Sequence, residues 1–242
     1  MRQIDLILES CDTRNLHPQL CVKLHGALMR GMSAKVAEGF HGKAPRPYSL
    51  FVVTRDDDTC MRVSALSEAA DPILDVAMRV KEFTVSGLCA PVKVLGRTEH
   101  PAVSAEKLLK MPPLRDFGLE LASPAVYKHG NAYRNMFSME ALLLTVAEKF
   151  NAFEGCCMDK PRIQKAVESI RYRNFALRGA TYEIKHSVML PACIGKLEAA
   201  TDGPADEIAD LSLLLRYATY AGLGARTALG MGGILLRENK NP

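Results

Sequence analysis

The chain has 242 residues, a formal net charge of +4 and 48% hydrophobic residues. That length suits one large or two small domains, and this hydrophobic content supplies a sizeable core. No run of about 18 apolar residues is present, and Arg2 and Asp5 interrupt the stretch where a signal peptide would be apolar. We therefore expect a cytoplasmic protein with no membrane partner.

The cysteines indicate neither a disulfide framework nor a zinc site. The seven cysteines are odd in number and form no C-x-x-C pair. Adjacent residues bridge poorly, so Cys156 and Cys157 are also expected to stay reduced. We expect no metal and no cofactor.

The positive charge gathers in two segments. Residues 160–196 carry +6 and residues 21–55 carry +5, which leaves −7 for the rest of the chain. Two basic segments on an otherwise acidic chain indicate a polyanionic partner. Tyr172, Phe175 and Tyr182 interleave the second segment, as stacking on unpaired bases requires. A solvated surface of mixed charge, with the aromatic rings turned to the core, is the alternative.

The first hundred or so residues alternate between strand and helix patterns. We expect a strand at 3–9, an amphipathic helix from about 18 to 39, strands at 48–55 and 60–66, a helix at 67–80, and strands at 82–87 and 91–98. This β-α-β-β-α-β order is that of a ferredoxin-like domain.

The second half repeats that order with additions. A strand is expected at 118–127, helices at 137–150 and 160–170, strands at 172–179 and 182–199, a helix at 204–220 and a strand at 233–238. The fold class is therefore α+β, with two tandem ferredoxin-like halves and a C-terminal glycine-rich loop. We place the domains at residues 1–110 and 111–242.

The stretch "AGLGARTALGMGGILL", residues 221–236, joins the last helix to the last strand. It is not a P-loop, because no Lys-Ser or Lys-Thr pair follows its last glycine. It is not a dinucleotide fingerprint either, because Thr227 stands at the third glycine position and the order runs from helix to strand. Five glycines around Arg226 indicate tight turns, or a place where another backbone or a phosphate comes close.

Several blocks resemble the RAMP superfamily of CRISPR-associated RNA-binding proteins, which share ferredoxin-like, RRM-like halves. They are "VKLHGALM", "FHGKAPRPYSLF", "SPAVYKHGNAYRNMFSMEALL", "YRNFALRGATYEIKHSVMLPACIGKLE" and "YAGLGARTALGMGGILL". The glycine block is the signature of that superfamily. Within it, the chain is similar to the CRISPR repeat-processing endoribonuclease, and more narrowly to the version that accompanies type III-A systems.

The resemblance implies RNA cleavage without a metal. A 2′-hydroxyl attacks its own 3′-phosphate and leaves a 2′,3′-cyclic phosphate and a free 5′-hydroxyl. His41 matches the general acid or base of this family, just after the first helix. Some members also carry a tyrosine inside that helix, and residues 18–38 contain none. The second proton-transfer role stays open among Tyr48, His25 and Lys43, and His25 is equally a candidate for a structural role.

The resemblance and the basic segments together suggest the residues that bind RNA. They are Arg46, Arg171, Arg173, Arg178, Lys185, His186, Gly222, Gly224, Arg226, Gly230 and Gly232. Freed backbone N–H groups of the glycine loop would face phosphate oxygens, and the loop would help to fix the two halves against each other. The first half would then carry the catalytic histidine, and the second would bind RNA.

Two other readings remain. One is a catalytically inactive RNA-binding subunit of the same superfamily, in which His41 is only a loop residue. The other is an unrelated α+β enzyme that binds a phosphorylated metabolite. The expected partner is the repeat of a CRISPR precursor RNA, and the resemblance leaves open a transient association with a type III-A effector complex and a homodimer.

Overall fold

A computed structural model describes residues 1–10, 20–40, 45–55, 58–184 and 188–238 of the protein. Its first half is a five-stranded antiparallel sheet in the order β2-β3-β1-β5-β4. The strands are β1 (Arg2–Glu9), β2 (Tyr48–Arg55), β3 (Asp58–Ala65), β4 (Glu82–Phe83) and β5 (Val92–His100), and the helices are α1 (Leu20–Arg30), α2 (Ala34–Gly39), η2 (Glu68–Ala70) and α3 (Asp71–Arg79). Without the short β4, this is the strand order of a ferredoxin-like fold.

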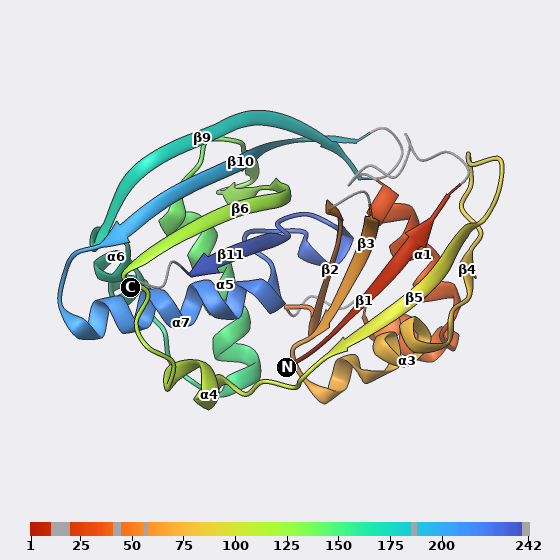
Figure 1. The fold of residues 1–242 in the computed structure, drawn as a ribbon, viewed down its shortest axis with the longest axis horizontal. Helices are drawn as coiled ribbons and strands as arrows, with labels where there is room; N and C mark the ends of the chain where they lie inside the picture. Colours follow the sequence, from red (N-terminus) through yellow and green to blue (C-terminus); the bar gives the residue numbers. More distant parts are fainter. Residues whose placement is uncertain (11–19, 41–44, 56–57, 185–187, 239–242) are drawn as a thin grey trace.

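The second half repeats this arrangement in a four-stranded sheet, β11-β6-β10-β9. The strands are β6 (Asp116–Ala125), β9 (Ile170–Glu183), β10 (Met189–Thr201) and β11 (Ile234–Glu238), and a separate hairpin joins β7 (Tyr127–His129) to β8 (Ala132–Arg134). The helices are α4 (Ala105–Leu109), α5 (Met139–Glu154), α6 (Lys160–Glu168), α7 (Ala205–Ala221) and η3 (Thr227–Leu229). Figure 1 shows β9 as the outer edge of this sheet, above β10 and β6.

The predicted fold class is confirmed. The strand expected at 82–87 covers only Glu82–Phe83, and two larger differences concern a helix and a strand. The single helix expected at 18–39 is two helices, because the chain turns at Gly31, where a Cβ atom would lie 2.6 Å from Val76, and starts α2 after Ser33. The break expected after residue 179 is absent, and β9 continues to Glu183. The boundary near residue 110 stays a prediction.

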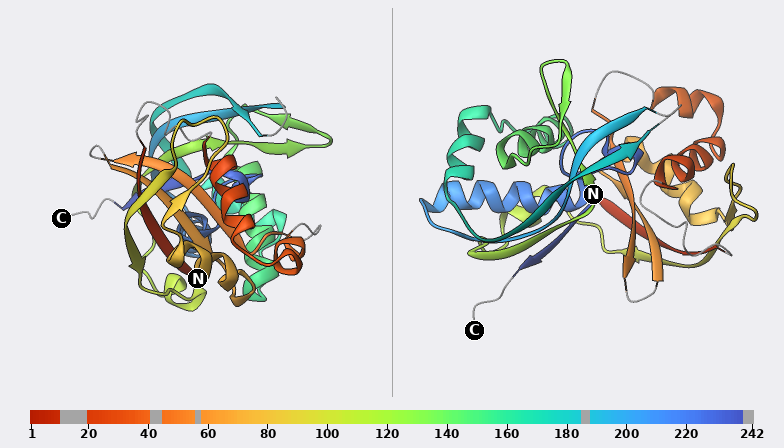
Figure 2. Two further views of the ribbon diagram at one scale, coloured as in Figure 1. Left: turned by 90° about the vertical axis from the view of Figure 1, so that its right-hand side faces the viewer. Right: turned by 90° about the horizontal axis from the view of Figure 1, so that it is seen from above.

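Each half has its own core, and a seam joins them. One core is built around Leu6, Leu24 and Leu50, and the other around Leu119, Leu143 and Leu214. Figure 2 (right) shows the two halves side by side. Across the seam, the Gln3 side-chain amide donates to the Thr219 carbonyl at 2.8 Å. The end of α7 is therefore attached to the sheet of the first half.

Among the described residues, no helix combines the length and the apolar character that crossing a membrane requires.

Candidate active site and RNA-binding surface

Three predicted site residues meet where α1 packs on the start of β2. The helix buries Leu20, Leu24 and Leu28 on one face, and His25 lies beside that stripe with 6% of its surface exposed. Its Nε2 atom lies 2.8 Å from the hydroxyl of Tyr48, the first residue of β2. The spacing of residues along α1 thus places the buried imidazole of His25 next to the buried phenol of Tyr48.

Arg46 completes this cluster. Its Nη1 atom donates to the Tyr48 hydroxyl at 3.3 Å, and the ring of Phe40 packs edge-on against the Tyr48 ring at 5.1 Å. A guanidinium can only donate, so the Tyr48 oxygen accepts from Arg46 and its own hydrogen can be donated to His25. Burial raises the pKa of Tyr48, and the neighbouring Arg46 partly opposes this rise. The phenol therefore keeps its proton at neutral pH.

His41 and Lys43 lie outside the described residues. The described residues on either side of this stretch, Phe40 and Arg46, both contact Tyr48. Tyr48 is itself fully buried. The His25, Tyr48 and Arg46 cluster is thus joined by contacts to both ends of the segment that carries the main catalytic candidate, whose role stays a prediction.

The glycine-rich loop is packed into the seam between the halves. A Cβ atom on Gly230 would lie 2.4 Å from the Cβ of Cys21 on α1, and one on Gly233 would lie 2.1 Å from the ring of Phe51 on β2. Within the loop, a Cβ on Gly232 would meet the Leu223 carbonyl oxygen at 2.1 Å. Close approach of neighbouring groups therefore accounts for these glycines.

The backbone of this loop is largely occupied by the protein itself. The N–H of Leu223 donates to the Gly232 carbonyl, that of Gly232 to Pro124, and that of Gly222 to Ala218. Gly222, Gly224, Gly230 and Gly232 are all buried. The expected role in fixing the halves agrees with this packing, while direct contact of these glycines with RNA stays a prediction.

Arg226 is the exposed residue of the loop. It is the one non-glycine residue with positive φ (62°) in the described part of the chain. Its Nε donates to the Tyr133 hydroxyl at 2.8 Å, and its guanidinium lies 5.7 Å from the centroid of that ring. The β7–β8 hairpin, which projects from the body in Figure 2 (right), therefore holds this cation at the surface.

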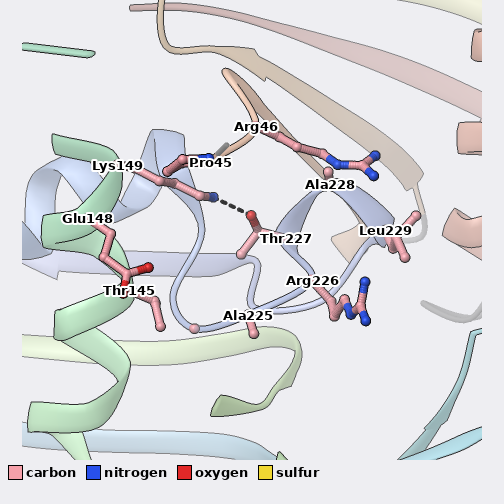
Figure 3. A pocket seen from close by; sticks show the side chains of 11 residues that line it. Pro45, Arg46, Thr145, Glu148, Lys149, Ala225, Arg226, Thr227, Ala228 and Leu229 are labelled. Carbon is pink, nitrogen blue, oxygen red and sulfur yellow. Dashed lines mark hydrogen bonds between the residues drawn. The ribbon is translucent and has the colours of Figure 1, made fainter. Parts of the chain in front are cut away.

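A cavity of about 310 Å³ lies between the loop, α5 and the segment at Pro45 and Arg46 (Figure 3). At its side, the buried Lys149 donates to the carbonyl of Ala221 at 2.5 Å and to the hydroxyl of Thr227. Burial lowers the pKa of Lys149 to about 7. The guanidinium groups of Arg46 and Arg226 point away from Lys149. The two hydrogen bonds of Lys149 join the end of α7 to the glycine loop.

Lys149 was not among the residues singled out from the sequence. A signal was present, because Lys149 stands three residues after Val146 and directly before Phe150, on the buried face of α5. A lysine on an apolar stripe needs acceptors in the interior. The end of a helix supplies such acceptors, since its last carbonyls have no partner within the helix.

Apart from Arg46 and Arg226, the basic residues predicted to bind RNA fall on or after β9. Arg171, Arg173 and Arg178 are exposed there, whereas Lys185 and His186 lie outside the described residues. Arg173 pairs with Asp116 at 2.5 Å, and Arg171 lies 3.9 Å from Asp202. Arg178 makes no hydrogen bond or ion pair within the described part of the chain. A carboxylate therefore lies close to Arg173, a more distant one lies near Arg171, and Arg178 has none among the described residues.

The aromatic residues of this segment divide into two groups. Tyr182 is fully buried, and its hydroxyl donates to the Leu229 carbonyl at 3.0 Å. Its expected stacking on bases is therefore wrong, and the physical reason is that Tyr182 closes the seam against the glycine loop. Tyr172 and Phe175 are exposed by 44% and 51%.

The described residues contain no group of three or more His, Cys, Asp or Glu side chains arranged to hold a metal ion.

Known proteins are similar in sequence to this chain over nearly its whole length. The CRISPR-associated endoribonuclease Cas6 of Streptococcus thermophilus is 26% identical over 237 residues, which cover 93% of this chain and 95% of that protein. The family model of the CRISPR-associated endoribonuclease Cas6 matches residues 119–234, from within β6 to the start of β11. The chain is thus similar to Cas6 endoribonucleases over nearly its whole length.

Further Cas6 proteins show the same similarity. Cas6 of Mycobacterium tuberculosis is 23% identical over 240 residues, covering 96% of this chain and 75% of that protein. A Cas6 product complex superimposes with a TM-score of 0.73 at 23% identity, over 98% of this chain and all of the other. Thermus thermophilus Cas6 gives 0.72 at 18% identity, over 98% of both chains. These structural likenesses establish the Cas6 fold for both halves.

Proposed function

We propose that this protein is a Cas6 endoribonuclease that cleaves CRISPR precursor RNA within its repeats. The observation that carries the proposal is the match to Cas6 endoribonucleases over nearly the full chain. Solved Cas6 structures that share this fold include a product complex and a substrate mimic complex. The basic strand β9 and the exposed Arg226 supply positive charge for a polyanion.

The reaction is an internal transesterification that needs no metal. The 2′-oxygen attacks the adjacent phosphorus, the bond from phosphorus to the 5′-oxygen breaks, and the products are a 2′,3′-cyclic phosphate and a 5′-hydroxyl. One group removes the 2′-proton and another protonates the leaving oxygen. A nearby cation stabilises the additional negative charge that develops on the phosphate oxygens.

We assign the proton transfer at the substrate to His41. Tyr48 is fully buried and His25 nearly so, and each is already bonded to the other. We therefore assign His25, Tyr48 and Arg46 to positioning, through the contacts of Tyr48 with Phe40 and Arg46, which flank residues 41–44 in the sequence. The second proton-transfer role falls to Lys43, the remaining candidate in that segment.

The finer assignments extend this proposal. The glycine block is the signature of the whole superfamily, and the other blocks resemble the type III-A version of the enzyme, so we assign the protein to that system. A cytoplasmic location, transient association with an effector complex and a homodimer stay predictions.

The test is an incubation of the purified protein with a repeat-containing RNA in EDTA. We expect one fixed cut, an upstream product that ends in a cyclic phosphate, and no cut when the scissile nucleotide carries a 2′-deoxy substitution. Binding without cutting would instead identify the inactive RNA-binding subunit. A requirement for a divalent ion would overturn the mechanism, and the absence of salt-sensitive RNA affinity would favour an unrelated enzyme.

A further inference from the structure

Three aromatic rings form a half-exposed cluster at the free edge of the second sheet. Phe137, in the connection between β8 and α5, packs edge-on against Tyr172 and Phe175, with ring centroids 6.5 and 5.4 Å apart. Tyr172 and Phe175 contact each other at 5.6 Å. Because β9 is the edge strand, no other strand of the described residues covers these three rings, which we call the aromatic shelf. The rings pack against one another, while about half of the Tyr172 and Phe175 surfaces faces outward.

A β-bulge creates this shelf. Residues three apart in a regular strand point to opposite faces, yet Tyr172 and Phe175 contact the same ring. The register explains this, because Tyr172 pairs with Ala199 and Asn174 pairs with Glu198, which leaves Arg173 as an extra residue. A bulge of this kind redirects the side chains that follow it.

The bulge places both rings on the helix-covered side of the sheet. Tyr172 pairs with Ala199 and Phe175 pairs with Leu197, and both partners are buried core residues. The shelf therefore lies around the sheet edge and not on the open face, which carries Arg178. A strand that presents rings on one side and guanidinium groups on the other can hold both the bases and the backbone of one polynucleotide.

The charge of this strand favours a nucleic acid over an apolar protein segment. From residue 171 to 182, β9 contains Arg171, Arg173 and Arg178 and no Asp or Glu. The side chains of Arg171 and Arg173 are 58% and 64% exposed, although Asp202 and Asp116 lie against them. Arg178 has no such carboxylate in the described part of the chain. Flat rings stack on any base, and nearby arginines contact the phosphates between bases.

We propose that this aromatic shelf, Phe137, Tyr172 and Phe175, binds unpaired nucleotides of RNA by stacking. The proposal rests on the proposed function for its biological substrate, but the shelf itself recognises single-stranded RNA of any sequence. It is separate from the His25 and Tyr48 cluster, which belongs to the first half. A bound RNA would thus be held at a second place, on the outer edge of the second half.

The sequence contains no tryptophan, which permits a direct test. Phe175→Trp retains a flat ring and introduces a single fluorophore on the shelf. Its emission should be quenched by an unstructured oligouridylate or oligoadenylate, because stacked bases quench indole. A matched control is Leu95→Trp, at a 61% exposed position on β5 of the first half, and its emission should change little.

A second pair of variants measures the energy of the contact. Tyr172→Leu and Phe175→Leu keep an apolar side chain but lose the flat ring, and each should weaken binding of single-stranded RNA about 5- to 100-fold. Circular dichroism and thermal unfolding confirm that the fold is retained. Unchanged binding by both variants, together with emission of the Phe175→Trp variant that does not respond to RNA, would overturn the shelf. Unchanged RNA binding and unchanged emission are also the results expected if the aromatic shelf binds a protein instead of RNA.

The outcomes separate the shelf from the proposed function. If the wild type cuts repeat RNA while both readouts are silent, the shelf is wrong and the function stands. If oligonucleotides quench the tryptophan while repeat RNA is never cut, the shelf stands and the endoribonuclease assignment is wrong for this chain.

Discussion

The Nε2 atom of His25 and the hydroxyl of Tyr48 lie 2.8 Å apart in the interior of the first half. One comes from the middle of α1 and the other from the first position of β2, so the contact fixes the start of this strand against the helix. His25 precedes the segment that carries His41, and Tyr48 follows it. A change in the His25–Tyr48 contact should therefore alter the rate of cleavage, although neither side chain is expected to contact the RNA.

Tyr48→Phe tests this positioning role. The change removes only the hydroxyl, which deletes one contact of His25 and one of Arg46 while the ring still packs against Phe40. We expect kcat to fall roughly tenfold and RNA affinity to stay within about twofold, with a loss of about 1 kcal/mol in the free energy of unfolding. Single-turnover cleavage and equilibrium binding separate these quantities. A normal kcat with normal stability would remove Tyr48 from the site.

His41→Ala carries the main catalytic prediction. If His41 transfers a proton while other surfaces hold the RNA, cleavage should fall by about two to four orders of magnitude, the usual contribution of a positioned acid or base, with near-native affinity. The companion variant is His25→Ala. If that variant alone abolished cutting, the mechanism would survive with the buried imidazole as its proton-transfer group.

The glycine loop should tolerate no Cβ atom at the seam. Gly230 has φ of 93° and lies against Cys21 and Tyr182, so Gly230→Val adds both backbone strain and overlap. We expect a loss of at least about 2 kcal/mol in the free energy of unfolding, or an insoluble protein, together with weaker RNA binding. Gly39→Ala is the matched control, since no atom of the described residues lies within 4 Å of a Cβ atom there. A Gly230→Val protein of normal stability would contradict the packing described for the seam.

The arginines of β9 should differ in their contribution to RNA binding. Arg178 has no carboxylate neighbour in the described part of the chain, whereas Arg173 is paired with Asp116. Arg178→Ala should therefore reduce the slope of log K for RNA binding against log salt concentration by about the amount expected for one phosphate contact. Arg173→Ala should reduce this slope less. Replacing Arg171, Arg173 and Lys185 together should weaken binding further. Equal slopes for all these variants and the wild type would place the RNA elsewhere.

Lys149 should make the stability of the seam depend on pH. The pKa of Lys149 is lowered to about 7 by burial, so between pH 7 and its ordinary value the unfolded chain binds a proton that the folded chain does not. Stability relative to Lys149→Met should rise by about 1 kcal/mol per pH unit as the pH increases above 7. Urea unfolding of both proteins from about pH 6 to 9 measures this difference. A constant difference would mean that Lys149 stays charged throughout.

Patterns of local spacing predicted most of the fold. The apolar stripe of α1 and the alternation in β1 and β6 depend on neighbours in sequence, so their elements and the repeated strand order could be read from the chain. The apolar stripe continues past Gly31 and so did not predict the break there, where a Cβ atom would lie 2.6 Å from Val76 of α3. Burial of Tyr182 likewise depends on the carbonyl of Leu229, far along the chain.

The candidate site was only partly predictable for the same reason. His25, Tyr48 and Arg46 could be named as candidates, but their mutual contacts required the packing of α1 on β2. The bulge at Arg173 changes the face on which Phe175 lies, and no local signal in the segment marks it. Lys149 was missed because its acceptors belong to α7 and the glycine loop.

The contacts of Gly230 with Cys21 and of Gly233 with Phe51 also set an order of events during synthesis. The ribosome makes α1 and β2 early, yet the segment that covers Cys21 and Phe51 is made only after every strand of the first half and after β9. A nascent chain therefore carries its catalytic candidates and its basic strand before it has the seam that aligns them. The two halves acquire their fixed relative position late in translation.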